Sequence, residues 1–152
     1  MPRVSPLPLP PHAGDVDLLP VVRAMTVVWE QPFTTPDVTK VRHALRDQLR
    51  GAGPADDIVD DFLVAAHELV INAVTHGGGA GVLRLRHGDG VMAVEVSDEG
   101  PGFAGGVTPA QLLPAGDVVG GRGLALARML TEGLVLVSGP GGVSATVLIR
   151  IR

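Results

Sequence analysis

The chain of 152 residues contains no cysteine and no tyrosine, and only 3% of its residues are aromatic. Without cysteine there is no disulfide, no thiolate nucleophile and no cysteine-bound zinc, so any metal would need oxygen or imidazole ligands. A strong positive charge is missing as well, because 12 Lys and Arg stand against 16 Asp and Glu. We therefore expect no direct binding of nucleic acid.

Long apolar runs are also absent. Charged residues such as Arg84, Glu95 and Arg128 interrupt every apolar stretch before it reaches the roughly 20 residues that span a bilayer. The first eleven residues alternate proline with leucine and cannot form the apolar helix of a secretory signal. We expect no membrane span and a cytoplasmic location.

Proline and glycine are abundant, with 13 and 21 residues, and both are unevenly placed. Six prolines lie within the first twenty residues. Because proline restricts φ and lacks a backbone donor, we expect a flexible, extended N-terminal arm over residues 1–22. Hydrophobic residues make up 45% of the whole chain, which is typical of a globular protein. Residues 23–152 are then long enough for one domain with a core.

Hydrophobic periodicity indicates both helices and strands in that domain. The expected helices are residues 36–50, 56–76 and 124–130, and the expected strands are residues 25–31, 82–87, 91–97, 134–137 and 145–151. Glycine and proline make residues 98–121 a long loop with at most one turn, near Gln111. This order predicts an α+β fold, a two-layer α/β sandwich with three helices on one face of a mixed, mostly antiparallel sheet.

The first motif lies on the expected helix 56–76. Glu68, Asn72 and His76 are four residues apart, so each lies about 40° further around the helix and the three form one polar stripe. A carboxylate and an amide oxygen one turn apart suit a hard cation and a general base. A solvated helix face would show the same Glu-x-x-x-Asn pair.

The second motif, Asp98-Glu99-Gly100-Pro101-Gly102-Phe103, stands where a strand ends and the long loop begins. Asp98 can accept a hydrogen bond from an amino group, while Gly100 and Gly102 let the backbone approach a flat or phosphorylated ligand. An ordinary turn uses the same residue types.

In the third motif, Gly120-Gly121-Arg122-Gly123-Leu124, glycines run directly into a helix. Free N–H groups and the positive end of the helix dipole attract phosphate there. A Walker A loop is excluded, because the Gly-Lys-Ser/Thr ending is missing. A flexible loop that merely precedes a helix is the alternative.

The three motifs, in this order and spacing, resemble the Bergerat ATP-binding fold of the GHKL superfamily, which gyrase, MutL and the catalytic domains of histidine kinases share. The run Glu68-Leu-Val-x-Asn72-Ala-x-x-His76, followed by Asp98-x-Gly100-x-Gly102-Phe and Gly121-x-Gly123-Leu, looks most like the anti-sigma factor serine kinases of bacteria. The resemblance covers residues 25–152.

The resemblance implies a role for each of these residues. Glu68 matches the general base for a serine hydroxyl, and Asn72 matches the Mg²⁺ ligand that bridges the phosphates. Asp98 matches the acceptor for the adenine amino group, and Gly100 with Gly102 the turn beneath the base. Nucleotide-binding residues also include His76, Gly121, Arg122, Gly123 and Leu124.

Residues 104–120 would be the ATP lid, and Arg122 at its end would reach the terminal phosphate, although an exposed arginine without a role fits equally well. The chain departs from the family in its last strand. The expected Gly-Thr motif is replaced by Gly142-Val-Ser144-Ala-Thr146, so either Ser144 or Thr146 could serve the adenine. We include Thr146 among the expected site residues.

The function that the resemblance implies is an ATP- and Mg²⁺-dependent protein serine kinase. It would phosphorylate an anti-anti-sigma partner of the STAS type, bind a sigma factor and regulate transcription by partner switching. The resemblance also implies a homodimer. One alternative is a nucleotide-gated protein-binding module without significant kinase activity. Another is an α+β domain that binds no ligand.

Overall fold

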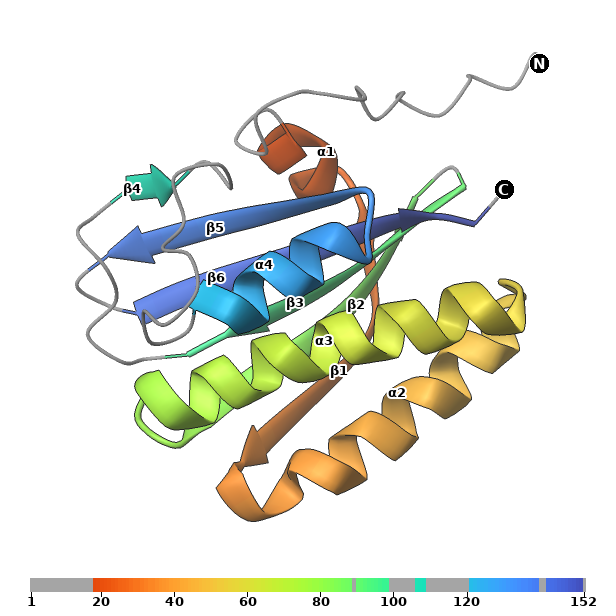
Figure 1. Ribbon diagram of the computed structural model, residues 1–152. Helices are drawn as coiled ribbons and strands as arrows, with labels where there is room; N and C mark the ends of the chain where they lie inside the picture. The colour runs from red at the N-terminus through yellow and green to blue at the C-terminus, as the bar shows by residue number, and fades with distance from the viewer. Residues whose placement is uncertain (1–17, 89, 99–105, 109–120, 140–141, 152) are drawn as a thin grey trace.

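A computed structural model describes residues 18–88, 90–98, 106–108, 121–139 and 142–151. The strands form one six-stranded sheet in the order β1-β2-β3-β6-β5-β4, and Figure 1 shows their arrangement. The strands are β1 (Thr26–Thr34), β2 (Ala80–Gly88), β3 (Val91–Ser97), β4 (Gly106–Thr108), β5 (Gly133–Gly139) and β6 (Gly142–Arg150). All pairings among these strands are antiparallel, so the parallel component of the expected mixed sheet is not found in the described residues.

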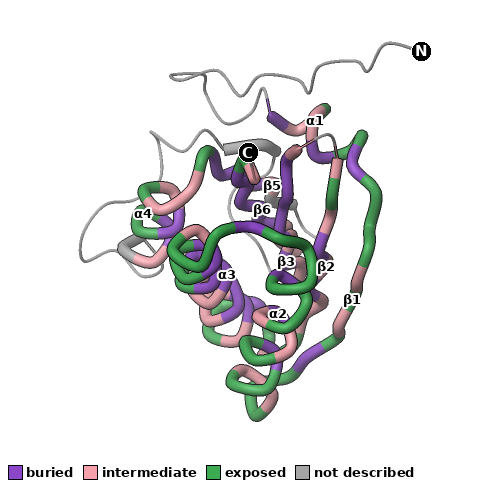
Figure 2. Tube along the Cα trace, turned by 90° about the vertical axis from the view of Figure 1, so that its right-hand side faces the viewer, coloured by how far each residue is buried: buried purple, intermediate pink, exposed green. Residues whose placement is uncertain are grey.

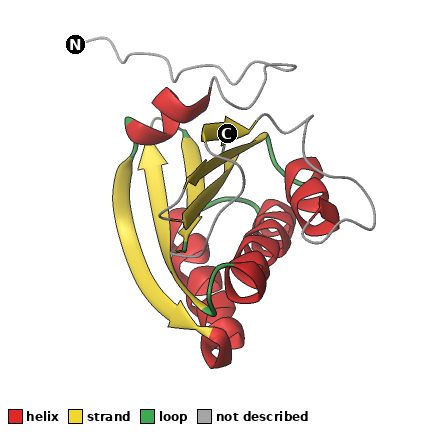
Figure 3. Cartoon of the chain, turned by 90° about the vertical axis from the view of Figure 1, so that its left-hand side faces the viewer, coloured by secondary structure: helices red, strands yellow, loops and turns green. Residues whose placement is uncertain are grey.

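The three longer helices, α2 (Val38–Ala52), α3 (Asp56–His76) and α4 (Gly121–Met129), cover one face of this sheet (Figure 3). The apolar side of α3 buries Phe62, Leu69 and Ala73 in the main core between the two layers. The strands supply alternate residues to the same core, because successive side chains of a strand point to opposite faces. The expected two-layer α+β sandwich is confirmed.

The other face of the sheet is partly covered by α1 (Leu19–Arg23). Leu18 and Val22 are buried there in a second cluster, against Val135 of β5 and Leu148 of β6. The central strands are consequently buried on both faces (Figure 2). The expected arm over residues 1–22 therefore needs correction at its end, since residues 18–22 pack on the sheet; residues 1–17 lie outside the described part.

Two further elements differ from the sequence-based expectation. Strand β1 continues through Pro32 to Thr34, which is compatible with proline because β1 is paired on one side only within the described sheet. Strand β4 lies inside the expected loop 98–121 and pairs with β5. Most of that loop, including the expected turn near Gln111, lies outside the described residues.

The start of α2 is closed by a capping box. A single 3₁₀ turn (Thr35–Asp37) precedes the helix, and Asp37 Oδ2 accepts hydrogen bonds from the backbone N–H and the hydroxyl of Thr34, at 2.9 and 3.0 Å. These two bonds hold the pKa of the Asp37 carboxyl below its ordinary value. The capping residue of this turn is therefore Thr34.

No helix in the described ranges is long and apolar enough to cross a bilayer.

Candidate functional site

The polar stripe of the first motif lies on the C-terminal half of α3. Helix α3 has the expected bounds, from Asp56 to His76. Glu68 and Asn72 are half-buried beside the core-facing Leu69 and Ala73, and His76 is exposed in the last turn. The helix therefore carries the stripe along the border between the core and the surface.

Asp98 directly follows β3 and is held by the neighbouring strand β6. Its backbone N–H donates to the Val143 carbonyl oxygen at 2.9 Å, and the Val143 N–H donates to Asp98 Oδ1 at 3.3 Å. The carboxylate is thus oriented by a main-chain donor of a central strand. It is also half-buried, which excludes part of the competing solvent.

The glycine that follows α3 is needed for this arrangement. A Cβ on Gly77 would overlap the Asp98 carboxylate and approach the Ala73 carbonyl oxygen at 2.6 Å. Its φ is −106°, whereas Gly78 and Gly79 have φ of 87° and 84°. A glycine run after a helix is usually explained by the positive φ that glycine allows. The structure instead requires Gly77 for space beside Asp98, and only the next two glycines for their backbone conformation.

The third motif forms the first turn of α4, which begins at Gly121, three residues before the start expected from the sequence. Its N–H groups have no partner within the helix, as in any first turn. A Cβ on Gly123 would lie 2.7 Å from Glu68 Oε1, so the absent side chain allows the carboxylate to approach this turn. The side chain of Arg122 lies outside the described part, as do Gly100 and Gly102.

A cavity of about 60 Å³ joins residues of all three motifs. Among the described residues, three polar side chains line it, those of Asn72, His76 and Asp98. The remaining lining is apolar: Leu69, Ala73, Val96, Leu124, Leu136, Val143 and Ala145. Apolar walls with a few polar groups are the usual make-up of a small-molecule site.

The amide of Asn72 supports a ligand in this cavity. Its Nδ2 atom is buried and has no hydrogen-bond partner within the described structure. A buried donor without a partner costs about 1–3 kcal/mol, so native proteins seldom leave one without a reason. An acceptor on a bound ligand would remove that cost.

The hydroxyls expected to serve the adenine do not line the cavity. Val143 and Ala145 face it, and by strand alternation Ser144 and Thr146 face the opposite side of the sheet. There the Ser144 hydroxyl donates to Glu95 Oε2 at 3.3 Å, and Thr146 is 3% exposed. Thr146 therefore does not line this cavity, and Gly142-Val-Ser144 alone does not show which face of the strand each residue takes.

Apart from Leu124, the apolar residues that line the cavity were not expected from the sequence. Leu69 and Ala73 are one helical turn apart on α3, and Val96 precedes Asp98 by two positions on β3, so each lies on the same face as a motif residue. Those spacings could have identified them. Leu136 and Ala145 could not be found in this way, because their strands reach the site only through the sheet order.

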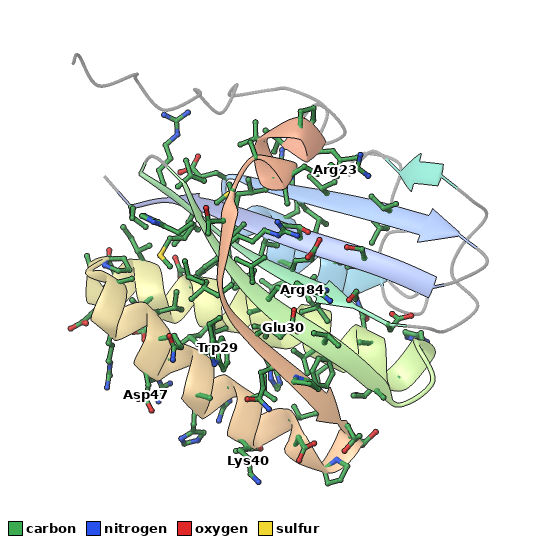
Figure 4. All side chains as sticks on the ribbon, turned by 180° about the vertical axis from the view of Figure 1, so that it is seen from behind. Arg23, Trp29, Glu30, Lys40, Asp47 and Arg84 are labelled. Carbon is green, nitrogen blue, oxygen red and sulfur yellow. The ribbon has the colours of Figure 1, made fainter. Side chains whose placement is uncertain are left out.

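A second, wider groove of about 740 Å³ lies on the other side of Asp98. Its lining includes Arg84, whose Nε donates to Glu30 Oε2 at 2.7 Å (Figure 4). The groove includes Asp98 but neither Asn72 nor Leu124. Because it joins only one of the three motifs, the smaller cavity is the candidate site.

Comparison with known proteins also indicates a nucleotide-binding domain. The model of the histidine kinase-like ATPase domain matches residues 32–149. No curated protein sequence matches the chain. A crystal structure of the RsbU and RsbW domains of Rv1364c from Mycobacterium tuberculosis is similar, with 25% identity and a TM-score of 0.59.

That similarity covers 82% of this chain and 32% of the other, so the chain spans about a third of the Mycobacterium tuberculosis structure. The histidine kinase AdeS of Acinetobacter baumannii is a more distant match, with 16% identity and a TM-score of 0.49. It aligns over 91% of this chain and 74% of AdeS.

Proposed function

The chain belongs to the histidine kinase-like ATPase family, and from this membership we propose that it is an ATP-dependent protein serine kinase of the anti-sigma factor type. The RsbW domain in the similar Mycobacterium tuberculosis structure supports this type. The observation that carries the proposal is the buried, unpartnered Asn72 amide in a cavity that also holds Asp98 and adjoins the first turn of α4.

The nucleotide would lie between two ends of the site. Asp98, held by Val143, would accept a hydrogen bond from the adenine amino group between apolar walls. The first turn of α4 would receive the phosphates through its free N–H groups. Glu68 contacts Gly123 in that turn, so its carboxylate belongs to the phosphate end.

The donor set of the site is compatible with Mg²⁺. No group of three His, Asp or Glu side chains in the described residues is placed to hold a metal alone. Mg²⁺, however, commonly takes one or two protein oxygens together with phosphates and water. Asn72 Oδ1 would be its protein ligand, and the ion would neutralise the charge that develops on the phosphates during transfer.

The transfer would follow from this placement. The serine oxygen of the partner attacks the γ-phosphorus, the bond from that phosphorus to the β–γ bridging oxygen breaks, and ADP leaves. Glu68 accepts the hydroxyl proton. The partner would be an anti-anti-sigma protein of the STAS type, with a sigma factor as the second ligand in partner switching and a homodimer as the working form.

One observation favours a second function, a nucleotide-gated binding module without significant catalysis. Glu68 does not line the cavity and lies instead against Gly123. In this function, nucleotide binding would change the surface offered to a partner, and Glu68 would hold α4 in place.

Phosphoryl transfer from γ-labelled ATP to a STAS-type partner tests the two functions. We expect phosphoserine with the wild type and a rate at least about 100-fold lower with Glu68→Gln, at unchanged ATP affinity. Glu132→Gln is the matched control, because Glu132 is exposed in the turn after α4. ATP binding without transfer to any partner would favour the binding module, and undiminished transfer in Glu68→Gln would remove Glu68 as the base.

A further inference from the structure

Strand β6 lines the cavity with apolar side chains and carries its two hydroxyl groups on its other face. Val143 and Ala145 face the cavity, whereas Ser144 and Thr146 face the opposite side of the sheet. The Ser144 hydroxyl is engaged there with Glu95. Position 145, where a side-chain hydroxyl could reach the cavity from β6, is an alanine.

Among the described residues that line the cavity outside α3, the only polar side chain is thus the carboxylate of Asp98. Asp98 can only accept hydrogen bonds when ionised. Asn72 and His76, the other two polar lining residues, belong to α3, and the proposed function uses Asn72 at the phosphates. From the described residues of β3, β5 and β6 and from Asp98, the base would therefore meet a single acceptor and apolar walls.

We propose that the nucleotide base is recognised through Asp98 without any hydroxyl from β6, and that Ala145 is the residue that determines how strongly the site discriminates adenine from guanine. This inference rests on the proposed function. It goes beyond that function by naming the residue behind base selection and by predicting that the selection is weak.

The chemistry of the two bases explains the weak selection. Adenine donates from its amino group to Asp98, but its N1 acceptor finds no side-chain donor on β6. Guanine in the same pose would place its O6 acceptor against the carboxylate, but a turned guanine donates from both N1–H and its amino group to the two carboxylate oxygens. Strong rejection needs a second group that the wrong base leaves unpaired, and alanine supplies none.

A hydroxyl at position 145 would add that second group. Ala145→Thr places a donor beside N1 of adenine, and Ala145→Val has the same shape without the hydroxyl. Ala145→Ser adds only one heavy atom at the cavity of about 60 Å³, and serves if the branched side chains prevent folding.

The experiment is calorimetric titration of the full chain and its variants with ATP and GTP, both with Mg²⁺. We expect wild-type affinities for the two nucleotides within about tenfold of each other. Ala145→Thr or Ala145→Ser should raise the ATP-to-GTP affinity ratio by about five- to tenfold, and Ala145→Val should leave it unchanged. Ser144→Ala and Thr146→Val should leave ATP affinity unchanged.

Three results would overturn the inference while leaving the proposed function intact. These are wild-type rejection of GTP by more than about 1,000-fold, weaker ATP binding in Ser144→Ala or Thr146→Val, and equal ratios for Ala145→Thr and Ala145→Val. Absence of ATP binding to the wild type would be a different outcome, because it would overturn the proposed function and the inference together.

Discussion

The two faces of the sheet, although they share the same strands, present opposite chemistry. On the helix side, Val143 and Ala145 line the cavity with Asp98 at its edge. On the opposite side, which α1 partly covers, Glu95 accepts hydrogen bonds from Arg86 at 3.1 Å and from Ser144 at 3.3 Å. Polar residues are thus numerous on the face that lacks the candidate site and sparse at the site itself. The number of polar groups on a face therefore does not identify the ligand site.

The largest effect on stability and ATP affinity should come from filling the space between the end of α3 and the Asp98 carboxylate. Gly77→Ala would force its Cβ into Asp98 and the Ala73 carbonyl. We expect a loss of about 1–3 kcal/mol in the free energy of unfolding and a clear loss of ATP affinity. Urea denaturation and calorimetry measure the two effects.

Gly51→Ala is the control for Gly77→Ala, because a Cβ at this α2 position meets nothing within 4 Å. It should stabilise the protein by about 0.5–1 kcal/mol. If the Gly77 and Gly51 variants behaved alike, the close approach of Asp98 to the end of α3 would be wrong.

The next effect contrasts acidic residues on opposite faces. Asp98→Asn should weaken ATP binding by about 10- to 100-fold, because a hydrogen bond to a charged acceptor is lost. Glu95→Gln should leave ATP affinity unchanged, since Glu95 faces Arg86 and Ser144. Equal losses of affinity in the two variants would contradict the assignment of the site to one face.

A smaller effect, on stability alone, is expected from Arg86, which lies on the face of the sheet opposite the cavity. Arg86 donates from Nη1 to the Met25 carbonyl oxygen at 3.2 Å and from Nη2 to Glu95, so it connects the segment after α1 to β3. Arg86→Met should lower the free energy of unfolding by about 1–2 kcal/mol without changing ATP affinity. A loss of nucleotide binding at unchanged stability would show that this face takes part in the site.

The smallest effect concerns Asp37, which is remote from the candidate cavity. Its pKa is lowered from an ordinary value of 3.8 by hydrogen bonds from Thr34. A lowered folded-state pKa stabilises the protein above pH 3.8, and this contribution disappears as the pH falls through the folded-state value. Asp37→Asn should therefore be less stable than the wild type at neutral pH, and the difference should vanish in acid. A difference independent of pH would exclude the capping box as its cause.

Much of the architecture follows from local pattern. The bounds of α3 are those expected, because apolar residues at helical spacing and a following glycine cluster mark both ends. The helix α1 was not expected from the sequence. It is short, and Leu18 and Val22 are buried only by packing on the second face of the sheet. Strand β4 was missed for a related reason, since its three residues depend on pairing with β5.

The sequence alone determined the three motifs, the family they resemble and the helix that carries Glu68, Asn72 and His76, because helical spacing is a local property of the chain. Only the tertiary structure decided which residues meet at the cavity. The register of β6 against β3 turns Ala145 toward Asp98 and Thr146 away from it. A shift of one residue reverses the faces of a strand, and register is set by pairing between segments distant in the chain.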